Sequence, residues 1–438
     1  MLASAPLGRD LSRMTFEIIR DPLWNNIRLD PLALSLVDTP AFQRLRYVRQ
    51  LGLAYLVYPG ASHSRFEHAL GAYHLSRRVL ALLDERGLMA ELRGDACVVT
   101  RTAALLHDVG HYPFSHALEE IGALHHEEVA RPLITSGRVA DILSAELGAD
   151  VPARVMALIR GESDSPLQGL ISGSLDLDKI EYLKRDAFMC GVNYGDIDVD
   201  RLLDSLTLVD DPERGRPTIG ISEKGLSALE SLLFAKYQMY RNVYWHHAVR
   251  SATAMYKRLV DGALRAGSLG AERLAGFTDE GLLHELAQHE PASPLLSALR
   301  ERRLYKRVFE CPAAELPPDG GEWIAEDRGL VVAVEDQLAR ELGLAAGEVL
   351  LDYPVKTKML GLDIPVLRRN GSVRRLTAEG WEGAVNLPKL SEELYGSARW
   401  LRVFASSRIT IPRHKVVRLA LTPADDVRAL LGRGTLLA

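Results

Sequence analysis

The stretch TAALLHDVGH, residues 102–111, ends an apolar run with helical spacing in an adjacent histidine and aspartate. On a helix His107 and Asp108 lie about 100° apart, so both can lean toward one ion, and His111 follows one turn later. An imidazole beside a carboxylate favours Mn, Fe, Ni, Co or Zn over Mg alone, because nitrogen ligands suit borderline transition metals. A lone His-Asp pair at a helix end is more often a cap with a surface histidine, so the metal interpretation needs further ligands.

Two other stretches offer such ligands. The segment HSRFEHALG, residues 63–71, places His68 at the start of a helix, and SLDLDKIEYLKRD, residues 174–186, places Asp178 early in another. Eight of the 13 histidines lie between His63 and His126, among helices that carry these acidic residues. Four ligands from separate helices, with positions left for water, would make a catalytic metal site.

The order of these motifs resembles a known family. HSRFEH, LLHDVGHYPFSH at residues 105–116, HHE at 125–127 and DLDKIEY at 176–182 are similar to the HD-domain superfamily of metal-dependent phosphohydrolases. Within it, QLGLAYLVYPGASHSRFEH at residues 50–68 resembles the deoxynucleoside triphosphate triphosphohydrolases. The resemblance covers roughly residues 18–249 and is vague after 266. We expect no sterile alpha motif domain of the kind that some members carry. The resemblance implies metal ligation by His68, His107, Asp108 and Asp178.

The chemistry then requires a polarised water, which Asp108 or a neighbouring carboxylate can orient, and groups that meet the charge developing on phosphoryl oxygens. We expect His116 to protonate the leaving oxygen, because an imidazole titrates near neutral pH; the alternative is an ordinary loop histidine. His126 is preferred over His125, because the family pattern places the histidine before Glu127 nearest the substrate. The predicted catalytic set is His116, His111 and Asp108. The predicted phosphate contacts are Arg65, His111, His116, His126 and Lys179.

By resemblance, the sugar pocket is lined by Gln50, Leu51, Tyr182, Asp186 and Tyr244. Asp178, Tyr182 and Asp186 recur every four residues and share a helix face, for which the alternative is an ordinary solvated charged face. Close packing against the 2′ carbon would exclude a ribose, since burying an unpaired hydroxyl costs on the order of 1–3 kcal/mol. One departure is Lys236, which stands where the family has a phosphate-contacting arginine.

A regulatory site is a further hypothesis. In DTPAFQRLR, residues 38–46, Asp38, Gln43 and Arg46 coincide with residues that read an activating guanine nucleotide between subunits in relatives. A carboxylate can accept from the guanine N1 and N2 edge, while amide and guanidinium groups donate. The same stretch is also an ordinary helix start, and Glu17 stands where relatives have a lysine for the activator phosphates. A working site would imply a GTP or dNTP activator and a homo-oligomer, either a dimer or a tetramer.

The chain of 438 residues is 47% hydrophobic, which predicts at least two domains. We expect a mainly α fold: an N-terminal β-hairpin and possible regulatory segment over residues 1–49, an HD-domain helical core over 50–265, and a C-terminal α+β accessory region over 266–438. A net charge of −5 gives no global basic field for nucleic acid, although the runs RLRYVR and RERRLYKR leave local binding open. Three scattered cysteines and no apolar leader or spanning segment predict a cytoplasmic protein.

Apolar periodicity predicts the individual elements. We expect strands at residues 15–19 and 26–29, helices at 31–37, 41–48, 65–83, 95–107, 125–134 and 176–187, and a hairpin near 210–215. One long helix is expected over residues 223–264. Beyond 267, short helices should alternate with β-rich stretches such as GLVVAV at 329–334 and VLLDYP at 349–354.

Three functions fit this sequence. The first is metal-dependent cleavage of a deoxynucleoside triphosphate into deoxynucleoside and inorganic triphosphate, with Mg carried by the nucleotide. The second is another HD hydrolase, such as a phosphatase, phosphodiesterase or nuclease, because the metal motif reports phosphoester chemistry rather than a substrate. The third is a non-catalytic nucleotide sensor or nucleic-acid scaffold. The sugar-pocket residues favour the first, and the intact ligand set disfavours the third.

Overall fold

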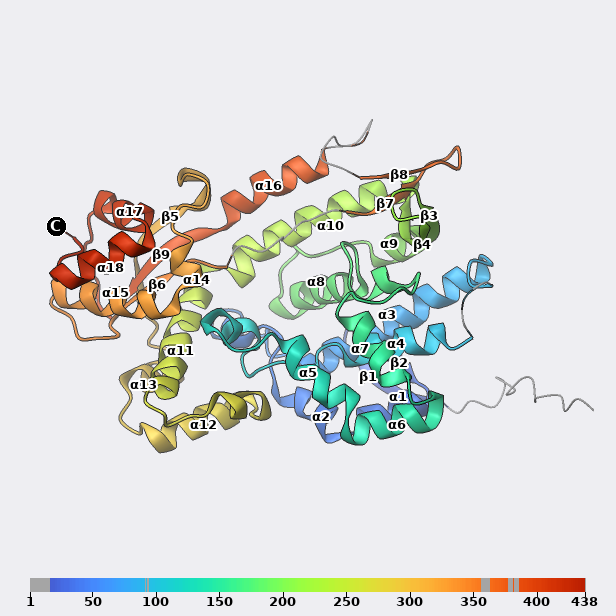
Figure 1. Ribbon diagram of the computed structural model, residues 1–438, viewed down its shortest axis with the longest axis horizontal. Coiled ribbons are helices and arrows are strands. Elements are labelled where there is room, and N and C mark those ends of the chain that lie inside the picture. Colours follow the sequence, from blue (N-terminus) through green and yellow to red (C-terminus); the bar gives the residue numbers. More distant parts are fainter. Residues whose placement is uncertain are drawn as a thin grey trace, which may run out of the picture.

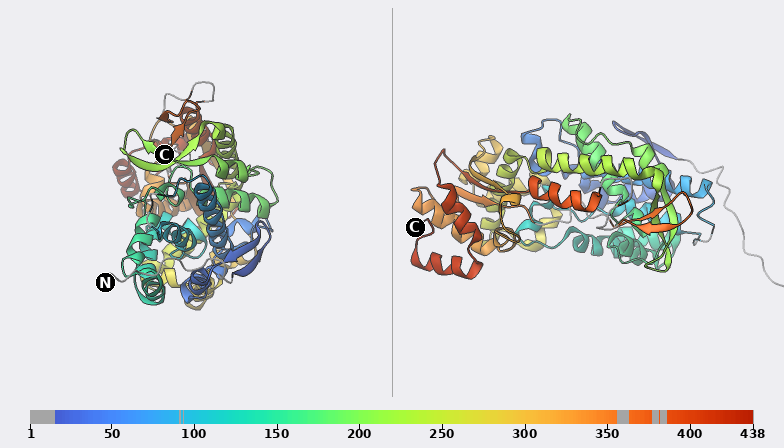
Figure 2. Two further views of the ribbon diagram at one scale, coloured as in Figure 1. Left: turned by 90° about the vertical axis from the view of Figure 1, so that its right-hand side faces the viewer. Right: turned by 90° about the horizontal axis from the view of Figure 1, so that it is seen from above.

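The computed structural model describes residues 16–90, 92, 94–355, 363–376, 381 and 386–437. The predicted mainly α architecture is confirmed: a helical core carries an N-terminal hairpin, and small sheets join it later in the chain (Figure 1). Figures 1 and 2 place the C-terminal sheet and its helices at one end of an elongated molecule. Within the described residues, no helix combines the length and the apolarity needed to cross a membrane.

The N-terminal hairpin consists of β1 (Glu17–Asp21) and β2 (Asn25–Leu29), paired antiparallel with Ile19 opposite Ile27. The predicted hairpin is confirmed, with its first strand displaced toward the turn; residue 15 lies outside the described residues. Asp21 stabilises the turn, because its Oδ1 accepts from the backbone N–H groups of Leu23 and Trp24. The hairpin leads into short helices, which are α1 (Pro31–Val37), α2 (Pro40–Gln43), η2 (Arg44–Tyr47) and η3 (Gly52–Leu56).

The helical core is a bundle built on α3 (Arg65–Glu85), whose buried face packs against α4 (Ala96–Leu106) and α8 (Leu177–Cys190). Its apolar residues recur at three and four, as predicted, and the expected helices at 65–83, 95–107, 125–134 and 176–187 are confirmed to within a few residues. The remaining elements of this region are η4 (Ser115–Ala117), η5 (Glu119–Ile121), α5 (His126–Thr135), α6 (Gly137–Leu147), α7 (Val151–Ile159), η6 (Gln168–Leu170) and α9 (Val199–Ser205).

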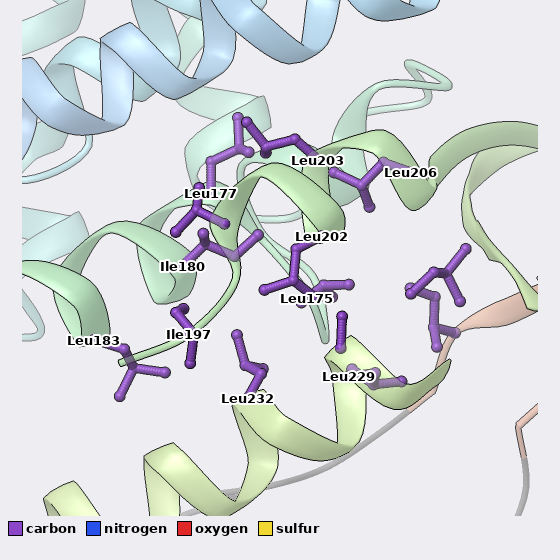
Figure 3. Close-up of a cluster of buried hydrophobic side chains, with 14 of the residues drawn as sticks. Leu175, Leu177, Ile180, Leu183, Ile197, Leu202, Leu203, Leu206, Leu229 and Leu232 are labelled. Carbon is purple, nitrogen blue, oxygen red and sulfur yellow. The ribbon is translucent and has the colours of Figure 1, made fainter. Parts of the chain in front are cut away.

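A leucine-rich core fixes α8 against the helices that follow it. Figure 3 shows Ile180 and Leu183 of α8 above Leu229 and Leu232 of α10 (Leu226–Met239), with Leu202 of α9 in the same cluster. The four leucines and the isoleucine are at most 2% exposed. Because this face of α8 is buried, its opposite face, which carries Asp178 and Tyr182, is held in one orientation, with Asp178 beside His68 and His107.

The single long helix expected over residues 223–264 is wrong. The segment consists of η7 (Glu223–Gly225), α10, the π-helical turn η8 (Tyr240–Tyr244) and α11 (His247–Arg265). The break follows from the cap at His246, which is extended rather than helical and whose Nδ1 accepts from the backbone N–H of Ala248. Apolar spacing continues across the break, so the periodicity alone did not reveal it.

Two sheets involve the chain after residue 266. The predicted hairpin near 210–215 is confirmed as β3 (Leu206–Asp211) and β4 (Arg216–Ser222), and β7 (Pro365–Leu367) and β8 (Val373–Arg375) extend that sheet in the order β3-β4-β7-β8. The second sheet has the order β5-β9-β6, with β5 (Lys306–Pro312), β9 (Trp400–Ala405) and β6 (Val349–Asp352). The division of the chain at residue 266 stays a prediction, because β7 and β8 join strands that precede it.

The predicted strand at 349–354 is confirmed as β6, but the β-rich assignment of 329–334 is wrong. That stretch lies in α15 (Arg328–Glu341), because Asp327 caps its N-terminus and Leu330, Val334 and Leu338 form one buried helical face. The other elements are η9 (Ala271–Gly276), α12 (Asp279–His289), α13 (Pro294–Arg300), η10 (Ala313–Glu315), α14 (Trp323–Glu326), α16 (Leu387–Ala398), α17 (Arg413–Leu421) and α18 (Ala424–Arg433).

Candidate active site

The four predicted metal ligands lie where the ends of three helices meet. His68 is in the first turn of α3, whose N-terminus is fixed by the capping box of Ser64 and Glu67. His107 and Asp108 directly follow the last residue of α4. Asp178 is the second residue of α8, which begins after the capping side chain of Asp176.

The four side chains are close together. His68 Nε2 lies 3.2 Å from His107 Nε2, and Asp178 Oδ1 lies 3.0 Å from the former and 3.5 Å from the latter. Asp108 Oδ1 is 3.3 Å from His107 Nε2, and its Oδ2 is 3.6 Å from His68 Nε2. His68 is fully buried, whereas the Asp178 side chain is 35% exposed, so the cluster faces outward through Asp178. Metal ligation by these residues stays a prediction.

The hydrogen bonds of the two imidazoles fit a cation. His68 Nδ1 lies 2.6 Å from Glu181 Oε2, and His107 Nδ1 lies 2.9 Å from the Ala104 carbonyl oxygen. Each Nδ1 therefore donates, so each Nε2 faces the other ring and Asp178, and it either carries a proton or offers a lone pair to a cation. Acceptor atoms this close repel one another unless a proton or a cation lies among them. Two imidazoles and two carboxylates are a donor set that a divalent transition metal accepts.

Protons compete with a cation for these atoms. Burial disfavours a charge on His68, but hydrogen bonds to Asp178 and Glu181 outweigh it and raise its pKa to about 10. Burial also disfavours a charge on His107, but Asp108 and Asp178 outweigh it and raise the pKa of this ring. Burial would raise the carboxyl pKa values, yet Arg65 and the histidines hold the pKa of Asp108 well below its usual range, and the two histidines do so for Asp178.

A second group of histidines adjoins this cluster. The rings of His111 and His126 stack with centroids 3.9 Å apart, and the His116 ring stands edge-on to His111 at 4.7 Å. Glu119 joins them: its Oε1 lies 2.9 Å from His126 Nδ1 and its Oε2 lies 3.2 Å from His116 Nδ1. His111 Nε2 lies 3.2 Å from Asp108 Oδ1, which connects the two groups.

The charges of this second group differ from those of the first. Burial, reinforced by Arg65, holds the pKa of His111 well below its usual value, and burial also lowers the pKa of His126. Burial opposes the charge of Glu119, but hydrogen bonds from His116 and His126 outweigh it and lower the carboxyl pKa. His116 itself is 56% exposed, so its ring can reach a bound molecule while Nδ1 is held by Glu119.

The loop that carries His116 has an unusual backbone. Phe114 and Ser115 both adopt left-handed conformations, with φ of 57° and 66°. Gly52, next to the predicted contacts Gln50 and Leu51, packs against this loop, and a Cβ atom at Gly52 would lie 2.8 Å from the Phe114 carbonyl oxygen. The close approach requires glycine at position 52 and brings the sugar-side segment against the histidine loop.

One cavity of about 730 Å³ is lined by the residues predicted for catalysis and substrate contact. Its walls include every residue predicted for catalysis or substrate contact, namely Gln50, Leu51, Arg65, Asp108, His111, His116, His126, Lys179, Tyr182, Asp186 and Tyr244. His125 lines it as well, but that side chain is 54% exposed and lies 3.9 Å from Glu119, whereas His126 is 13% exposed and makes the direct contact.

The end of the cavity beyond the metal cluster is lined by tyrosines and one buried carboxylate. Tyr244 Oη donates to Asp186 Oδ2 at 2.7 Å, and His63 Nε2 lies 2.8 Å from Asp186 Oδ1. The Tyr182 and Tyr244 rings meet edge to face with centroids 6.3 Å apart. Asp186 is therefore held in place from two sides at the position predicted for a sugar contact.

The two predicted phosphate-binding cations, Arg65 and Lys179, each form an ion pair with an aspartate of the site. Arg65 Nη1 donates to Asp108 Oδ2 at 2.6 Å, and Lys179 Nζ donates to the Gly173 carbonyl oxygen at 2.9 Å and to Asp176. Lys236 is 6% exposed, and burial together with the charge of Lys179 lowers its pKa to about 8.

Two carboxylates of the site, Glu181 and Glu119, were not predicted from the sequence. Glu181 accepts from His68, from Arg185 Nε at 2.8 Å and from Trp24 Nε1 at 2.8 Å, so it connects the metal cluster to the N-terminal hairpin. Glu119 holds the second histidine group. A spacing of three residues placed Glu181 near Asp178 and Glu119 near His116, and this was the only available signal.

The predicted regulatory residues lie elsewhere. Asp38 and Arg46 are exposed outside the cavity. Gln43 Nε2 donates to the Val37 carbonyl oxygen at 2.8 Å, and its Oε1 accepts from Arg46 Nε at 2.7 Å. The Arg46 guanidinium also lies 3.6 Å from the centroid of the Phe66 ring. The three residues are near one another, and a nucleotide role for them stays a prediction.

A helical core with His, His-Asp and Asp side chains gathered at one cavity defines the HD class of proteins. The HD domain model matches residues 65–169, and the HD associated region matches residues 197–379. Protein MJ1154 of Methanocaldococcus jannaschii is 35% identical over 364 residues, which are 82% of this chain and 74% of that protein. The chain belongs to the HD phosphohydrolase family.

Two further similarities extend over most of the chain. The human deoxynucleoside triphosphate triphosphohydrolase SAMHD1 is 26% identical over 408 residues, which are 80% of this chain and 62% of the human protein. The crystal structure of a hypothetical protein from Aquifex aeolicus superimposes with a TM-score of 0.69 at 26% identity, covering 96% of this chain and 99% of the other. The second similarity includes the C-terminal region, where the sequence resemblance was vague.

Proposed function

We propose that this protein hydrolyses deoxynucleoside triphosphates to deoxynucleoside and inorganic triphosphate. The observation that carries the proposal is a single cavity that joins three groups: the His-Asp metal cluster, the histidines held by Glu119, and the Tyr182, Asp186 and Tyr244 side chains. The first two groups suit a phosphate chain, and the third suits the sugar that adjoins it. The similarity to a known dNTP triphosphohydrolase supports the same substrate class.

His68, His107, Asp108 and Asp178 would hold the metal, with Mn, Fe, Ni, Co or Zn as candidates. A divalent ion at this position supplies Lewis acidity toward water and phosphoryl oxygens. Glu181 and the Ala104 carbonyl orient the two imidazoles for it. Arg65 neutralises part of the charge of Asp108 and contributes a buried cation beside the phosphate position.

The proposed reaction forms a bond between water oxygen and the α-phosphorus and breaks the bond from phosphorus to the sugar 5′ oxygen. His116, which lines the cavity and is held at Nδ1 by Glu119, delivers a proton to that leaving oxygen. Asp108 orients the attacking water, which loses one proton to solvent as it bonds to phosphorus, and His116 regains a proton from solvent after the sugar leaves. The remaining triphosphate charge meets Arg65, His111, His126 and Lys179, with Lys236 nearby as a cation whose charge decreases above about pH 8.

The sugar side favours a deoxyribose. Tyr182 and Leu51 close the cavity beside Asp186, which is positioned to accept from a sugar hydroxyl. A ribose would bury an additional hydroxyl among these groups. An unpaired buried hydroxyl costs on the order of 1–3 kcal/mol, which corresponds to roughly a tenfold to hundredfold preference for the deoxynucleotide.

The test is product analysis with each dNTP and the matching rNTP, in Mn and in EDTA, with Asp178→Ala as the inactive variant. We expect inorganic triphosphate from dNTPs alone, and none in EDTA or from the variant. Monophosphate esters or diesters turned over in place of dNTPs would identify another HD hydrolase. Bound metal without any turnover would reject catalysis in favour of a sensor.

The same assay tests the proposed regulation. Added GTP or a second dNTP should raise the rate if Asp38, Gln43 and Arg46 bind an activator, and Arg46→Ala should abolish that increase without changing the unstimulated rate. Sedimentation with and without the nucleotide tests the proposed homo-oligomer. A rate that does not respond to any added nucleotide would reject the regulatory site.

A further inference from the structure

A buried group of four charges connects the C-terminal region to the segment that carries Glu119. Arg250 of α11 donates from Nη1 and Nη2 to both carboxylate oxygens of Glu120 at 2.9 and 2.8 Å. Its Nε and Nη2 donate to the two carboxylate oxygens of Asp352 at 3.0 and 2.6 Å. Lys257, which is also in α11, donates to Glu120 Oε2 at 2.7 Å. These contacts join two cations to two carboxylates, and the buried Arg402 lies opposite Asp352 on the neighbouring strand β9.

The members of this group come from separate parts of the chain. Asp352 ends β6 in the C-terminal sheet and is 1% exposed. Glu120 is in η5, immediately after Glu119, whose carboxylate holds His116 and His126. Arg250, 5% exposed, lies between them and also lines the active-site cavity. Four of the five N–H groups of Arg250 are used in these contacts.

We propose that Arg250, anchored by Asp352, is a positioning residue that fixes η5 through Glu120 and thereby holds the Glu119 carboxylate against His116 and His126. The C-terminal region then acts on the catalytic histidines although it supplies none of them. The inference rests on the proposed function for the role of His116, but the geometry that it predicts is measurable without a substrate.

The fork geometry of arginine is what makes this arrangement possible. A planar guanidinium engages two carboxylates edge-on in fixed directions, whereas an ammonium group is a point charge without such directions. Hydrogen bonds of this kind are strong inside a protein and fix orientation as well as distance. Rotation of η5 by a small angle would separate Glu119 from two rings at once, because both are held by that single carboxylate.

A matched control exists on the same helix. Arg258 of α11 donates to Asp336 Oδ1 of α15 at 2.6 Å, so it also joins α11 to the C-terminal region, but it makes no contact with η5. Asp352→Asn and Asp336→Asn each remove one carboxylate charge from such a contact. Only the former should disturb the histidines if Arg250 positions them.

The first measurement is the ring spectrum of ¹³C-labelled histidine in the full chain, assigned with His116→Gln and His126→Gln. In Asp352→Asn and in Arg250→Lys we expect the His116 and His126 signals to shift, and in Asp336→Asn to stay unchanged. The melting temperature and the bound Mn per chain check that each variant is folded. Unchanged signals in both Asp352→Asn and Arg250→Lys would overturn the proposal.

The second measurement is dNTP turnover by the same variants. We expect kcat to fall about tenfold in Asp352→Asn and Arg250→Lys with KM within twofold, while Asp336→Asn keeps both values. A purely structural role would lower the melting temperature and leave kcat per folded molecule unchanged, which would also overturn the proposal. If the wild-type protein does not turn over dNTPs but the signals shift as expected, the proposed function fails and the positioning role stands.

Discussion

At the scale of single residues, the metal cluster should be a site of competition between protons and cations. The hydrogen bonds of His68 raise its pKa to about 10, so the ring carries a proton at neutral pH, and an ion must displace it to bind Nε2. Raising the pH toward 10 removes this competition. We therefore expect Mn affinity to rise about tenfold per pH unit between pH 6.5 and 8.5, because one proton is released for each ion bound.

Calorimetry in two buffers of different ionisation enthalpy measures that proton directly. Glu181→Gln serves as the matched variant: it keeps the shape of the side chain but removes a charge that holds the proton on His68. The Mn affinity of this variant should depend less steeply on pH than that of the wild-type protein. Binding heats that do not change with the buffer would contradict the assignment of His68 as a protonated ligand.

Which residues could be predicted depends on how much chemistry their spacing carries. The gathering of His68, His107 and Asp178 within 4.8 Å could be predicted because each lies in a motif that fixes its helix end. Glu181 could not, because a carboxylate four residues before Arg185 is an ordinary ion pair on a helix. Its function depends on Trp24, which is distant in sequence and reaches it only through the fold.

At the scale of elements, the N-terminal hairpin supports the metal cluster. Trp24 donates to Glu181 Oε1, and Asp21 Oδ2 accepts from Arg185 Nη1 at 3.0 Å, so the β1–β2 turn holds Glu181, the partner of His68, and also Arg185, which donates to Glu181. Trp24→Phe removes one donor from Glu181 and should weaken Mn affinity about tenfold. This is the lower end of the loss caused by mutating residues that hydrogen-bond to metal ligands, because Trp24 acts on His68 only through Glu181.

The matched control is Trp323→Phe, which also removes an indole hydrogen bond, from Trp323 Nε1 to the Ala420 carbonyl oxygen at 3.1 Å in the C-terminal region. It should lower the melting temperature without changing Mn affinity. Equal Mn affinities in the two variants would show that the hairpin is scaffold only.

The type of an element could be predicted where the apolar period and the capping residues agreed. The prediction was wrong where a capping residue was missed. The β-branched run at residues 329–334 suggested a strand, but Asp327 starts a helix there and Leu338 continues the buried face beyond the run. Across residues 240–246 the opposite happened, because apolar spacing continued although the π-helical turn ends at Tyr244 and His246 caps the start of α11. Local chemistry of single polar residues decided both cases.

At the scale of the whole molecule, the region after residue 266 packs against the helical core that precedes it. β7 pairs parallel with β4, with Val366 opposite Ile221, and Leu387 joins the core that includes Leu229. In another core, Leu350 and Phe404 pack with residues of α11. These long-range pairings were not visible in the sequence, because short strands of three residues carry almost no periodic signal.

A chain ending at residue 265 should therefore not fold stably. Val366, Leu387, Leu350 and Phe404 are fully buried, and each contributes about 1.5–3 kcal/mol by burial, so losing all of them removes an amount comparable to the whole stability of a typical domain. Truncation would also remove Asp352, the second carboxylate that Arg250 contacts besides Glu120. We expect no cooperative thermal transition and no Mn binding from the fragment. The full chain melted under the same conditions is the control. A fragment that melts sharply and binds one Mn would instead establish residues 1–265 as a part of the chain that folds independently, and the C-terminal region would then be an accessory that the metal site does not require.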